Sequence, residues 1–359
     1  MQSMGTSKFA HYTQDEMEPH TPRSLGYRMP AEWEPHAATW LAWPHKRESW
    51  PDKFEPIPLL YAELVKMLAQ FEQVNILAGA PLVMEQAQSL VGNVANVTLW
   101  DIPTDDAWIR DHGPTFLVSP PREPPALIDW GYNAWGGKYP PYDLDDAVPL
   151  HIGRRQGRRI FEPGIILEGG AIEVNGKGTL LTTEQCLLNP NRNPQLSRAE
   201  VERYLCEYLN VANVLWLGRG IEGDDTDGHI DELARFVNPT TVVAPLEDSA
   251  GDPNHLPLRE NFDRLKSMRD QDGQPLEVVP LPMPQRMFHE GQRLPASYCN
   301  FYIANGVVIA PVFDDPADAR ALDLLRSLFA GREVVGLPAR DLAWGLGAFH
   351  CITQQEPAR

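Results

Sequence analysis

The chain has 359 residues, of which 43% are hydrophobic and 22% are charged, a composition typical of a globular protein with a large buried core. Its formal net charge of −18 disfavours nucleic acid and anionic membranes as partners, because both bind basic surfaces. No apolar run approaches the roughly 20 residues of a membrane helix, and the N-terminus lacks a secretory pattern, so we expect a cytoplasmic protein.

The N-terminal segment mixes polar, histidine and proline residues without periodicity, which predicts a flexible tail over residues 1–26. We interpret residues 27–359 as a single catalytic domain. The sequence contains four cysteines that form no CxxC pair and are too scattered for a disulfide framework, namely Cys186, Cys206, Cys299 and Cys351. This leaves room for a free, reactive thiol.

From Tyr27 onward the chain repeats a hairpin of two strands rich in β-branched and aromatic residues, an amphipathic helix and a further single strand. Three hairpins are predicted to turn at Asn175-Gly176, Asn238-Pro239 and Asn305-Gly306, whose first residues lie 63 and 67 positions apart. At that spacing the chain has room for about five units.

Each unit needs neighbours to cover its faces, so a ring of units is favoured. The sequence therefore predicts an α/β fold in the form of a five-bladed, pseudo-symmetric propeller, built from strand-hairpin-helix units around a central axis. An ordinary α+β domain with coincidental spacing is the alternative.

Polar residues of unusual type gather where the hairpins begin. Asp111, Gly170 and His229 each precede a predicted strand, and each lies 59 residues after the one before it. Glu168 lies just before Gly170, and Asp231 lies just after His229. If the units surround an axis, these equivalent positions meet there and form one pocket. Cys351, near the C-terminus, would complete that set.

A cysteine, a histidine and several carboxylates suit the hydrolysis of a guanidinium group. Two carboxylates can hold the planar cation by bidentate hydrogen bonds and direct its carbon toward a thiolate. The bound cation would also lower the pKa of the Cys351 thiol, so the substrate helps to generate its own nucleophile. His229 can protonate the departing ammonia and then accept a proton from the water that resolves the covalent intermediate.

At these residues the chain resembles the agmatine deiminase and bacterial peptidylarginine deiminase family, within the guanidino-group-modifying superfamily. The resemblance runs from MPAEWEPHAATWLAWP to HCITQQ and includes WIRDHGPTF, LEGGAIEVNGKGTLLTT, NPNRNP, DTDGHID and SYCNFYIANG. It implies a five-bladed α/β propeller, no cofactor, and hydrolysis of agmatine to N-carbamoylputrescine and ammonia, a step of putrescine biosynthesis. A homodimer is expected from the resemblance alone.

The resemblance also implies roles for individual residues. Cys351 would be the nucleophile, His229 the acid and base, and Asp111 with Asp231 the guanidinium ligands. The implied substrate-binding residues are Trp108, Asp225 and Glu168, the last in a supporting position. One departure is notable, because the family usually carries GGGNIHC where this chain has GLGAFHC at residues 345–351. This change bears on how the substrate tail is held.

Other interpretations of these residues are less favourable. We expect no metal site, because the acidic run at residues 224–229 lacks the carboxylate spacing of a calcium loop and no zinc-type spacing occurs. Cys186 and Cys206 are interpreted as structural, and Cys299 is left open. His350 is also interpreted as structural, because adjacent residues on a strand point to opposite faces.

Rival functions remain open. Deimination of free or peptidyl arginine would need a cationic or amide-rich contact for the carboxylate or peptide tail. A Cys-His-Asp protease or transglutaminase uses the same residue types, but it would not need several carboxylates facing the nucleophile. A catalytically silent guanidine-binding or interaction protein is opposed by the joint presence of the predicted catalytic residues. The expected partner is a small cationic guanidine.

Overall fold

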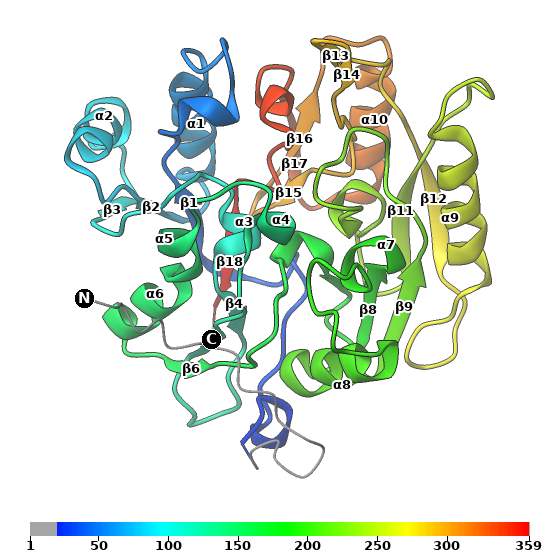
Figure 1. The fold of residues 1–359 in the computed structure, drawn as a ribbon, viewed down its shortest axis with the longest axis horizontal. Helices are drawn as coiled ribbons and strands as arrows, with labels where there is room; N and C mark the ends of the chain where they lie inside the picture. Colours follow the sequence, from blue (N-terminus) through cyan, green and yellow to red (C-terminus); the bar gives the residue numbers. More distant parts are fainter. Residues whose placement is uncertain (1–19, 359) are drawn as a thin grey trace.

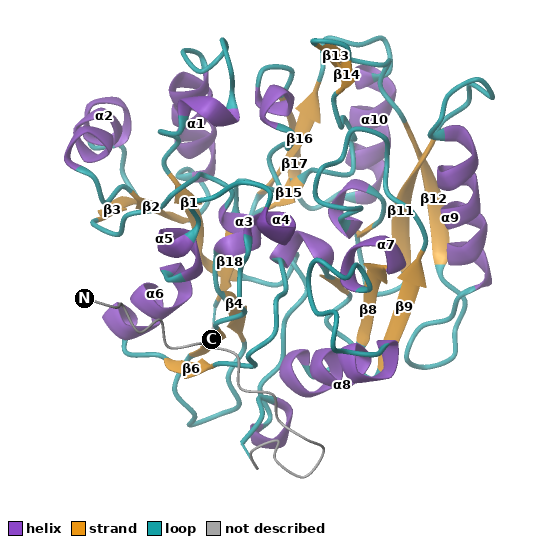
Figure 2. Cartoon of the chain, viewed as in Figure 1, coloured by secondary structure: helices purple, strands orange, loops and turns teal. Residues whose placement is uncertain are grey.

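The structure is a computed structural model that describes residues 20–358. The described chain forms an α/β fold of five small sheets and a separate two-stranded hairpin (Figure 1). Figure 2 shows the longer helices around the outside of the view, with most strands and the short helices α3 (Ile109–His112) and α4 (Ala134–Gly137) inside them. Within residues 20–358, no helix has both the length and the apolar character needed to cross a membrane.

Every one of the five sheets combines an antiparallel strand pair with a parallel pair. Four sheets have three strands: β4 (Thr115–Leu117), β5 (Ala126–Ile128) and β6 (Arg159–Phe161); β7 (Glu173–Val174), β8 (Thr179–Thr183) and β9 (Asn213–Leu217); β10 (Arg235–Phe236), β11 (Thr241–Leu246) and β12 (Glu277–Pro282); β15 (Tyr302–Ile303), β16 (Val307–Val312) and β17 (Glu333–Pro338). The fifth joins the two ends of the described chain in the order β18 (Gln354–Pro357), β1 (His36–Ala42), β2 (Gln73–Leu77) and β3 (Val97–Trp100). The separate hairpin is β13 (Phe288–His289) with β14 (Gln292–Arg293).

A helix crosses over between the parallel strands of each sheet, since such strands cannot be joined by a tight turn. The crossover helices are α1 (Ile57–Leu68), α2 (Pro81–Val91), α6 (Val148–Gln156), α8 (Arg198–Leu209), α9 (His255–Ser267) and α10 (Asp318–Leu328). Two further short helices are α5 (Asp143–Asp146) and α7 (Glu184–Leu187). The apolar sides of the crossover helices pack on the sheets, so the central strands β8, β11 and β16 are buried along nearly their whole length.

The three predicted turns are confirmed, because they join β7 to β8, β10 to β11 and β15 to β16. Gly176 has the positive φ of +67° that a tight turn needs. Asn175 Oδ1 accepts the backbone N–H of Lys177 over 2.9 Å, and Asn238 Oδ1 accepts that of Thr241, also over 2.9 Å. The asparagines therefore close these turns with their own side chains. The α/β class is confirmed, whereas the closed ring of five blades stays a prediction.

The N-terminal boundary differs from the prediction. Residues 1–19 of the predicted tail lie outside the described residues, but Thr21 is buried and its hydroxyl donates to Glu207 on α8 over 3.0 Å. Arg23, in the short helix η1 (Arg23–Leu25), donates to the carbonyl of Val211 over 3.2 Å. For residues 20–26 the prediction of a flexible tail is thus wrong, because Thr21 and Arg23 bind α8 and the residue Val211 that follows it. The single catalytic domain over 27–359 stays a prediction.

The polar motifs lie on short helical turns that contact one another. Asp111 belongs to α3, Glu168 precedes the turn η3 (Gly169–Ala171), and Asp231 belongs to the turn η4 (Ile230–Glu232). Helix α3 contacts η3, and η3 contacts η4. Motifs that are 59 residues apart in the sequence are therefore neighbours in the fold.

Candidate active site

A cavity of about 230 Å³ opens beside these helical turns. Four of the seven predicted site residues line it, namely Trp108, Asp111, Asp225 and Cys351. The other three, His229, Asp231 and Glu168, are buried directly behind that wall. The structure therefore gathers the predicted residues around one cavity, but in two layers.

The nucleophile candidate Cys351 is held by Asn300. The side-chain amide of Asn300 donates from Nδ2 to the sulfur of Cys351 over 3.1 Å. Its Oδ1 accepts the backbone N–H groups of His350 over 3.0 Å and of Cys351 over 3.3 Å. Sequence reasoning missed this role, although the position of Asn300 just before a predicted hairpin was a usable signal.

Negative charge surrounds the Cys351 sulfur, which lies 3.8 Å from Oδ2 of Asp231. Burial, followed by the carboxylates of Asp231, Glu232 and Asp111, raises the pKa of the Cys351 thiol well above its usual value. A cation bound beside these carboxylates would offset them and favour the thiolate.

Two hydrogen-bond donors hold the carboxylate of Asp111, and the residue still lines the cavity. Its Oδ2 accepts Trp135 Nε1–H over 2.9 Å, and its Oδ1 accepts the backbone N–H of Gly170 over 2.9 Å. Burial raises the pKa of Asp111, with further contributions from Asp231 and Glu168, and His229 opposes them. Sequence reasoning also missed Trp135, which lies in a left-handed stretch that the following Gly-Gly pair could have indicated.

His229 lies behind Asp111 and is 1% exposed. Its Nδ1 is 3.6 Å from Oδ1 of Asp111, and neither ring nitrogen has a hydrogen-bond partner among the described residues. Burial lowers the pKa of His229, but Asp111, Cys186 and Glu168 outweigh it and raise the pKa well above its usual value. This direction of the shift favours the protonated imidazole, the form that can donate a proton.

Asp231 is held in its charged form by His350. Nδ1 of His350 lies 2.7 Å from Oδ2 of Asp231, while Nε2 of His350 lies 2.8 Å from Oε2 of Glu32. Burial acts to raise the pKa of Asp231, yet the hydrogen bond and charge of His350 bring it below its usual value. Oδ1 of Asp231 is buried and has no hydrogen-bond partner in residues 20–358, so its capacity as an acceptor is unused.

The contacts of His350 agree with its interpretation as a structural residue. The reason given for it, that His350 and Cys351 are neighbours on one strand, is wrong. Residues 349–352 form turns rather than a strand, so strand alternation does not apply to them. Glu32, which sequence reasoning missed, also pairs with Arg235 over 2.8 Å. Burial opposes ionisation of Glu32, but Arg235, His350 and Arg110 together lower its pKa well below its usual value. His350 thus links a charged support network to Asp231.

Gly170 makes the convergence of these groups sterically feasible. A Cβ atom at this position would lie 2.5 Å from Nδ1 of His229, 2.7 Å from Oδ1 of Asp111 and 3.2 Å from Oδ2 of Asp231. Real Cβ atoms do not approach polar atoms this closely without displacing them. The glycine in the Glu-Gly-Gly motif is therefore required by the close approach of the three side chains.

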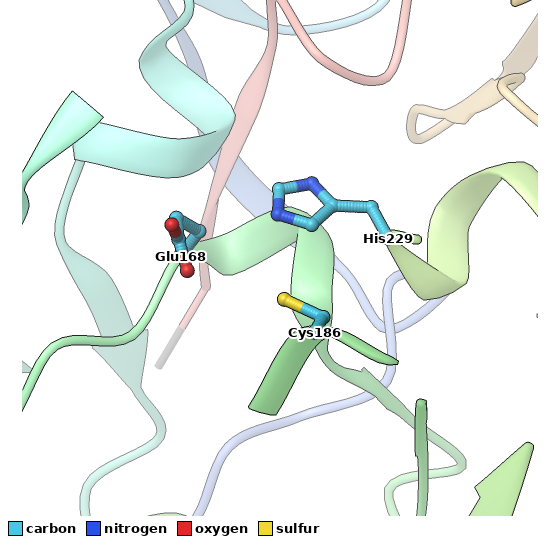
Figure 3. A group of neighbouring side chains, drawn as sticks. All are labelled: Glu168, Cys186 and His229. Atoms are coloured by element: carbon cyan, nitrogen blue, oxygen red, sulfur yellow. The ribbon is translucent and has the colours of Figure 1, made fainter. Parts of the chain in front are cut away.

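Glu168 is fully buried below the cavity instead of lining it. Its Oε1 accepts Nε–H of Arg192 over 2.5 Å, and Arg192 also pairs with Asp227 over 2.8 Å. This burial agrees with the supporting position expected for Glu168, because one carboxylate oxygen binds Arg192 and the side chain lies beside Cys186 and His229 (Figure 3).

Trp108 and Asp225 lie at different depths of the cavity. Trp108 is 5% exposed and packs on Trp50 with ring centroids 5.2 Å apart. A Cβ on Gly347 would lie 2.6 Å from the Trp108 ring, so this glycine lets the ring lie next to the Cys351 loop. Asp225 lies nearer to solvent, where the hydroxyl of Tyr139 donates to it and Lys138 Nζ lies 3.6 Å away.

Two groups of buried side chains in residues 20–358 could offer ligand atoms to a metal ion. One consists of Asp231, Glu232 and Cys351, and the other of Glu168, Cys186 and His229. In the first group only Cys351 lines the cavity, and Asp231 and Glu232 are buried behind it. The second lies one layer deeper.

Comparison with known proteins connects this arrangement to a family. Residues 28–357 match the family model of Porphyromonas-type peptidyl-arginine deiminase. The chain is 42% identical to the agmatine deiminase of Pseudomonas aeruginosa strain LESB58, with 94% of this chain and 97% of that protein covered.

Solved structures agree with the sequence comparison. An agmatine deiminase of Enterococcus faecalis matches with a TM-score of 0.88 at 35% identity, covering 94% of this chain and 98% of that one. A cysteine-to-serine variant of a C. jejuni agmatine deiminase with substrate bound matches with a TM-score of 0.85 at 31% identity, covering 92% and 96%. The chain belongs to the agmatine deiminase and Porphyromonas-type peptidyl-arginine deiminase family.

Proposed function

We propose that this protein hydrolyses agmatine to N-carbamoylputrescine and ammonia. One observation carries the proposal: the Cys351 sulfur faces a cavity beside two buried carboxylates, and Oδ1 of Asp231 has no hydrogen-bond partner among the described residues. Such a site suits a compact cation with several N–H donors. The similarity of the chain to agmatine deiminases over 94% of its length supports the same substrate.

Asp111 and Asp231 are the proposed ligands of the guanidinium group. Asp111 is held by Trp135 and Gly170, and Asp231 is held by His350, so neither carboxylate has to reorganise when the cation binds. Carboxylates placed on either side of the planar group would direct its carbon toward Cys351. Fixed positioning of this kind contributes strongly to rate, because the reacting atoms are already aligned.

The proposed reaction begins when the Cys351 thiol releases its proton to solvent and the thiolate attacks the guanidinium carbon, forming a C–S bond. His229 donates a proton to one terminal nitrogen, the C–N bond breaks, and ammonia leaves. A water molecule then attacks the amidino carbon while His229 takes one of its protons. The C–S bond breaks, the sulfur keeps the electron pair, and the neutral ureido product is released once the proton left on the added oxygen passes to solvent.

The charges of the cavity favour agmatine over free arginine. Its charged lining residues are mainly acidic, and Lys46 already lies 3.5 Å from Oδ2 of Asp106. The carboxylate of arginine would need a cation of its own at this wall, because an unpaired buried charge is costly. Agmatine carries positive charge at both ends and has no such requirement.

We also infer that the five sheets surround a central axis as the blades of a propeller. The inference is supported by the common pairing pattern of the sheets and by the contacts that link α3, η3 and η4. Contact between β18 and β4 joins the sheet at the chain ends to the next sheet. A crystal structure would test it, because a ring requires each sheet to contact two others.

Two further proposals concern the setting of the protein. All four cysteines are free, which fits a reducing compartment such as the cytoplasm. The homodimer expected from the family resemblance stays a proposal that sedimentation equilibrium would test.

The substrate is tested by measuring ammonia release from agmatine, free arginine and a peptidyl-arginine in parallel. We expect release from agmatine with a kcat/KM at least about 100-fold above that for arginine, a difference of roughly 3 kcal/mol in transition-state binding. Equal or faster release from arginine or the peptide would keep the chemistry and overturn the substrate. No release from any of the three would overturn the proposed reaction.

A further inference from the structure

We propose that Glu168, Cys186 and His229 form a binding site for one divalent cation of zinc type, and that the bound ion inhibits the enzyme. The inhibitory part rests on the proposed function, because it assumes that His229 transfers protons. The binding part does not depend on it.

The three residues offer the ligand types that zinc prefers. One ligand atom from each lies within 4.8 Å of the other two, and all three residues are buried. Figure 3 shows the three side chains next to one another, and they come from three separate segments: the residue before η3, helix α7, and the residue before η4. A small inward movement would bring these atoms to the distances of about 2.0 to 2.3 Å at which zinc binds such ligands.

Ligand capacity remains unused at this cluster. Oε2 of Glu168 and both ring nitrogens of His229 are buried and have no partner at hydrogen-bond geometry in the described part of the chain, although Cys186 lies near enough to raise the pKa of His229. Because Nδ1 of His229 faces Asp111, the other ring nitrogen is the one available to the cluster. Buried polar atoms without partners are unfavourable, and a bound cation would satisfy them.

The surroundings hold the three ligands in place. Arg192 binds Oε1 of Glu168 and thereby leaves the other oxygen free. Thr183, at the start of α7, donates to the carbonyl of Gly228 over 2.6 Å and ties the Cys186 helix to the residue before His229. Outer contacts of this kind are what metal sites use to orient their ligands.

The chemistry of the cluster selects the class of ion. A thiolate and an imidazole favour zinc and similar borderline ions, whereas calcium and magnesium require more oxygen ligands than Glu168 supplies. Binding would release the Cys186 thiol proton and any proton on the coordinating nitrogen of His229 to solvent. A His229 ring nitrogen bound to metal can no longer carry a proton, so turnover stops.

Cobalt(II) is a suitable probe, because a thiolate bound to it gives a charge-transfer absorption in the near ultraviolet. We expect this band when cobalt(II) is titrated into the wild-type protein. Cys351→Ser should retain it. The control Cys206→Ser, whose thiol lies on the partly exposed side of α8, should retain it as well. The band should be lost in Cys186→Ser. If the band were lost in Cys351→Ser but retained in Cys186→Ser, the metal would bind at Asp231, Glu232 and Cys351, and the proposed site would be wrong. Absence of the band in the wild-type protein would also overturn the proposal.

Anomalous diffraction at the zinc edge, from wild-type crystals soaked in zinc, requires no variant. A peak between Glu168, Cys186 and His229 is expected, and a peak elsewhere or no peak would contradict the proposal. Zinc should inhibit agmatine turnover at least tenfold less strongly in Cys186→Ser than in Cys206→Ser. Equal inhibition of the two variants by zinc would overturn the inhibitory role. If the wild-type protein did not turn over agmatine at all, the proposed function would be wrong, but the cobalt and diffraction measurements would still test the binding site.

Discussion

Asn300 binds Cys351 through both ends of its side-chain amide: Nδ2 donates to the sulfur over 3.1 Å and Oδ1 accepts the backbone N–H over 3.3 Å. Nδ2 also donates to Oε1 of Glu232 over 2.8 Å. Burial, with Asp231 and Asp224 adding to it, raises the pKa of Glu232 well above its usual value. Asn300 is therefore a positioning residue that sets both the location and the surroundings of the nucleophile candidate.

Replacing Asn300 should separate its support of the Cys351 loop from its effect on the charge around the sulfur. Asn300→Ala removes the support of the loop, and we expect kcat to fall about 10- to 100-fold. Asn300→Asp keeps the acceptor for the backbone N–H groups but places negative charge near the sulfur, which raises the pKa of the thiol. The pH at which alkylation of Cys351 by iodoacetamide accelerates should therefore be higher in Asn300→Asp than in Asn300→Ala. Identical pH profiles would show that Asn300 has no electrostatic effect on the thiol.

Asp111→Asn should change reactivity and turnover in opposite directions. Asp111 is one of the carboxylates that raise the pKa of the Cys351 thiol, so its neutralisation lowers that pKa and moves the alkylation profile to lower pH. At a fixed pH below the midpoint, alkylation becomes faster. Turnover of agmatine becomes slower, because a ligand of the guanidinium group is lost. An unchanged alkylation profile would remove Asp111 from the surroundings of the thiol.

Gly170→Ala should abolish most activity without unfolding the protein. The added methyl group would displace the side chains of His229 and Asp111, and a misplacement of about 1 Å can cost roughly 100-fold in rate. Gly331→Ala is a matched control, because a Cβ there would meet no heavy atom within 4 Å. Equal kcat values for the two variants would contradict the assigned packing around Gly170. Circular dichroism would verify the fold of both.

Leu346→Gly tests the departure from the family motif. Leu346 lines the cavity and adopts a left-handed φ of +70°, a conformation that costs a non-glycine residue about 1 to 2 kcal/mol. Glycine relieves this strain but increases the entropy of the unfolded chain, so we expect only a small change in melting temperature. Removal of the side chain should raise the kcat/KM for arginine relative to agmatine. An unchanged ratio would show that Leu346 does not contact the substrate tail.

Much of the fold was predictable because local signals specify it. The asparagine turns and the alternation of hairpin and helix were sufficient for the α/β class, and the regular spacing of Asp111, Gly170 and His229 indicated that distant motifs meet. Cys351 and Asp111 line one cavity, as their motifs predicted.

The remaining features depend on contacts between remote segments, which the local pattern does not contain. Glu32 binds His350 across the fold, and Thr21 binds Glu207 on α8. Glu168 was expected in a supporting position, but its partner Arg192 could not be read from the local pattern. The two-layer packing of the helical turns, rather than residue type, decides that Asp111 lines the cavity while Asp231 lies directly behind it.

The central claim is that Cys351 carries out the hydrolysis of agmatine. The most direct test is ammonia release from agmatine by Cys351→Ser, compared with wild type and with the control variant Cys206→Ser, after circular dichroism has shown that all three are folded. We predict wild-type release from Cys206→Ser and a decrease of at least about 1,000-fold in Cys351→Ser. Release from Cys351→Ser at the wild-type rate would contradict the account.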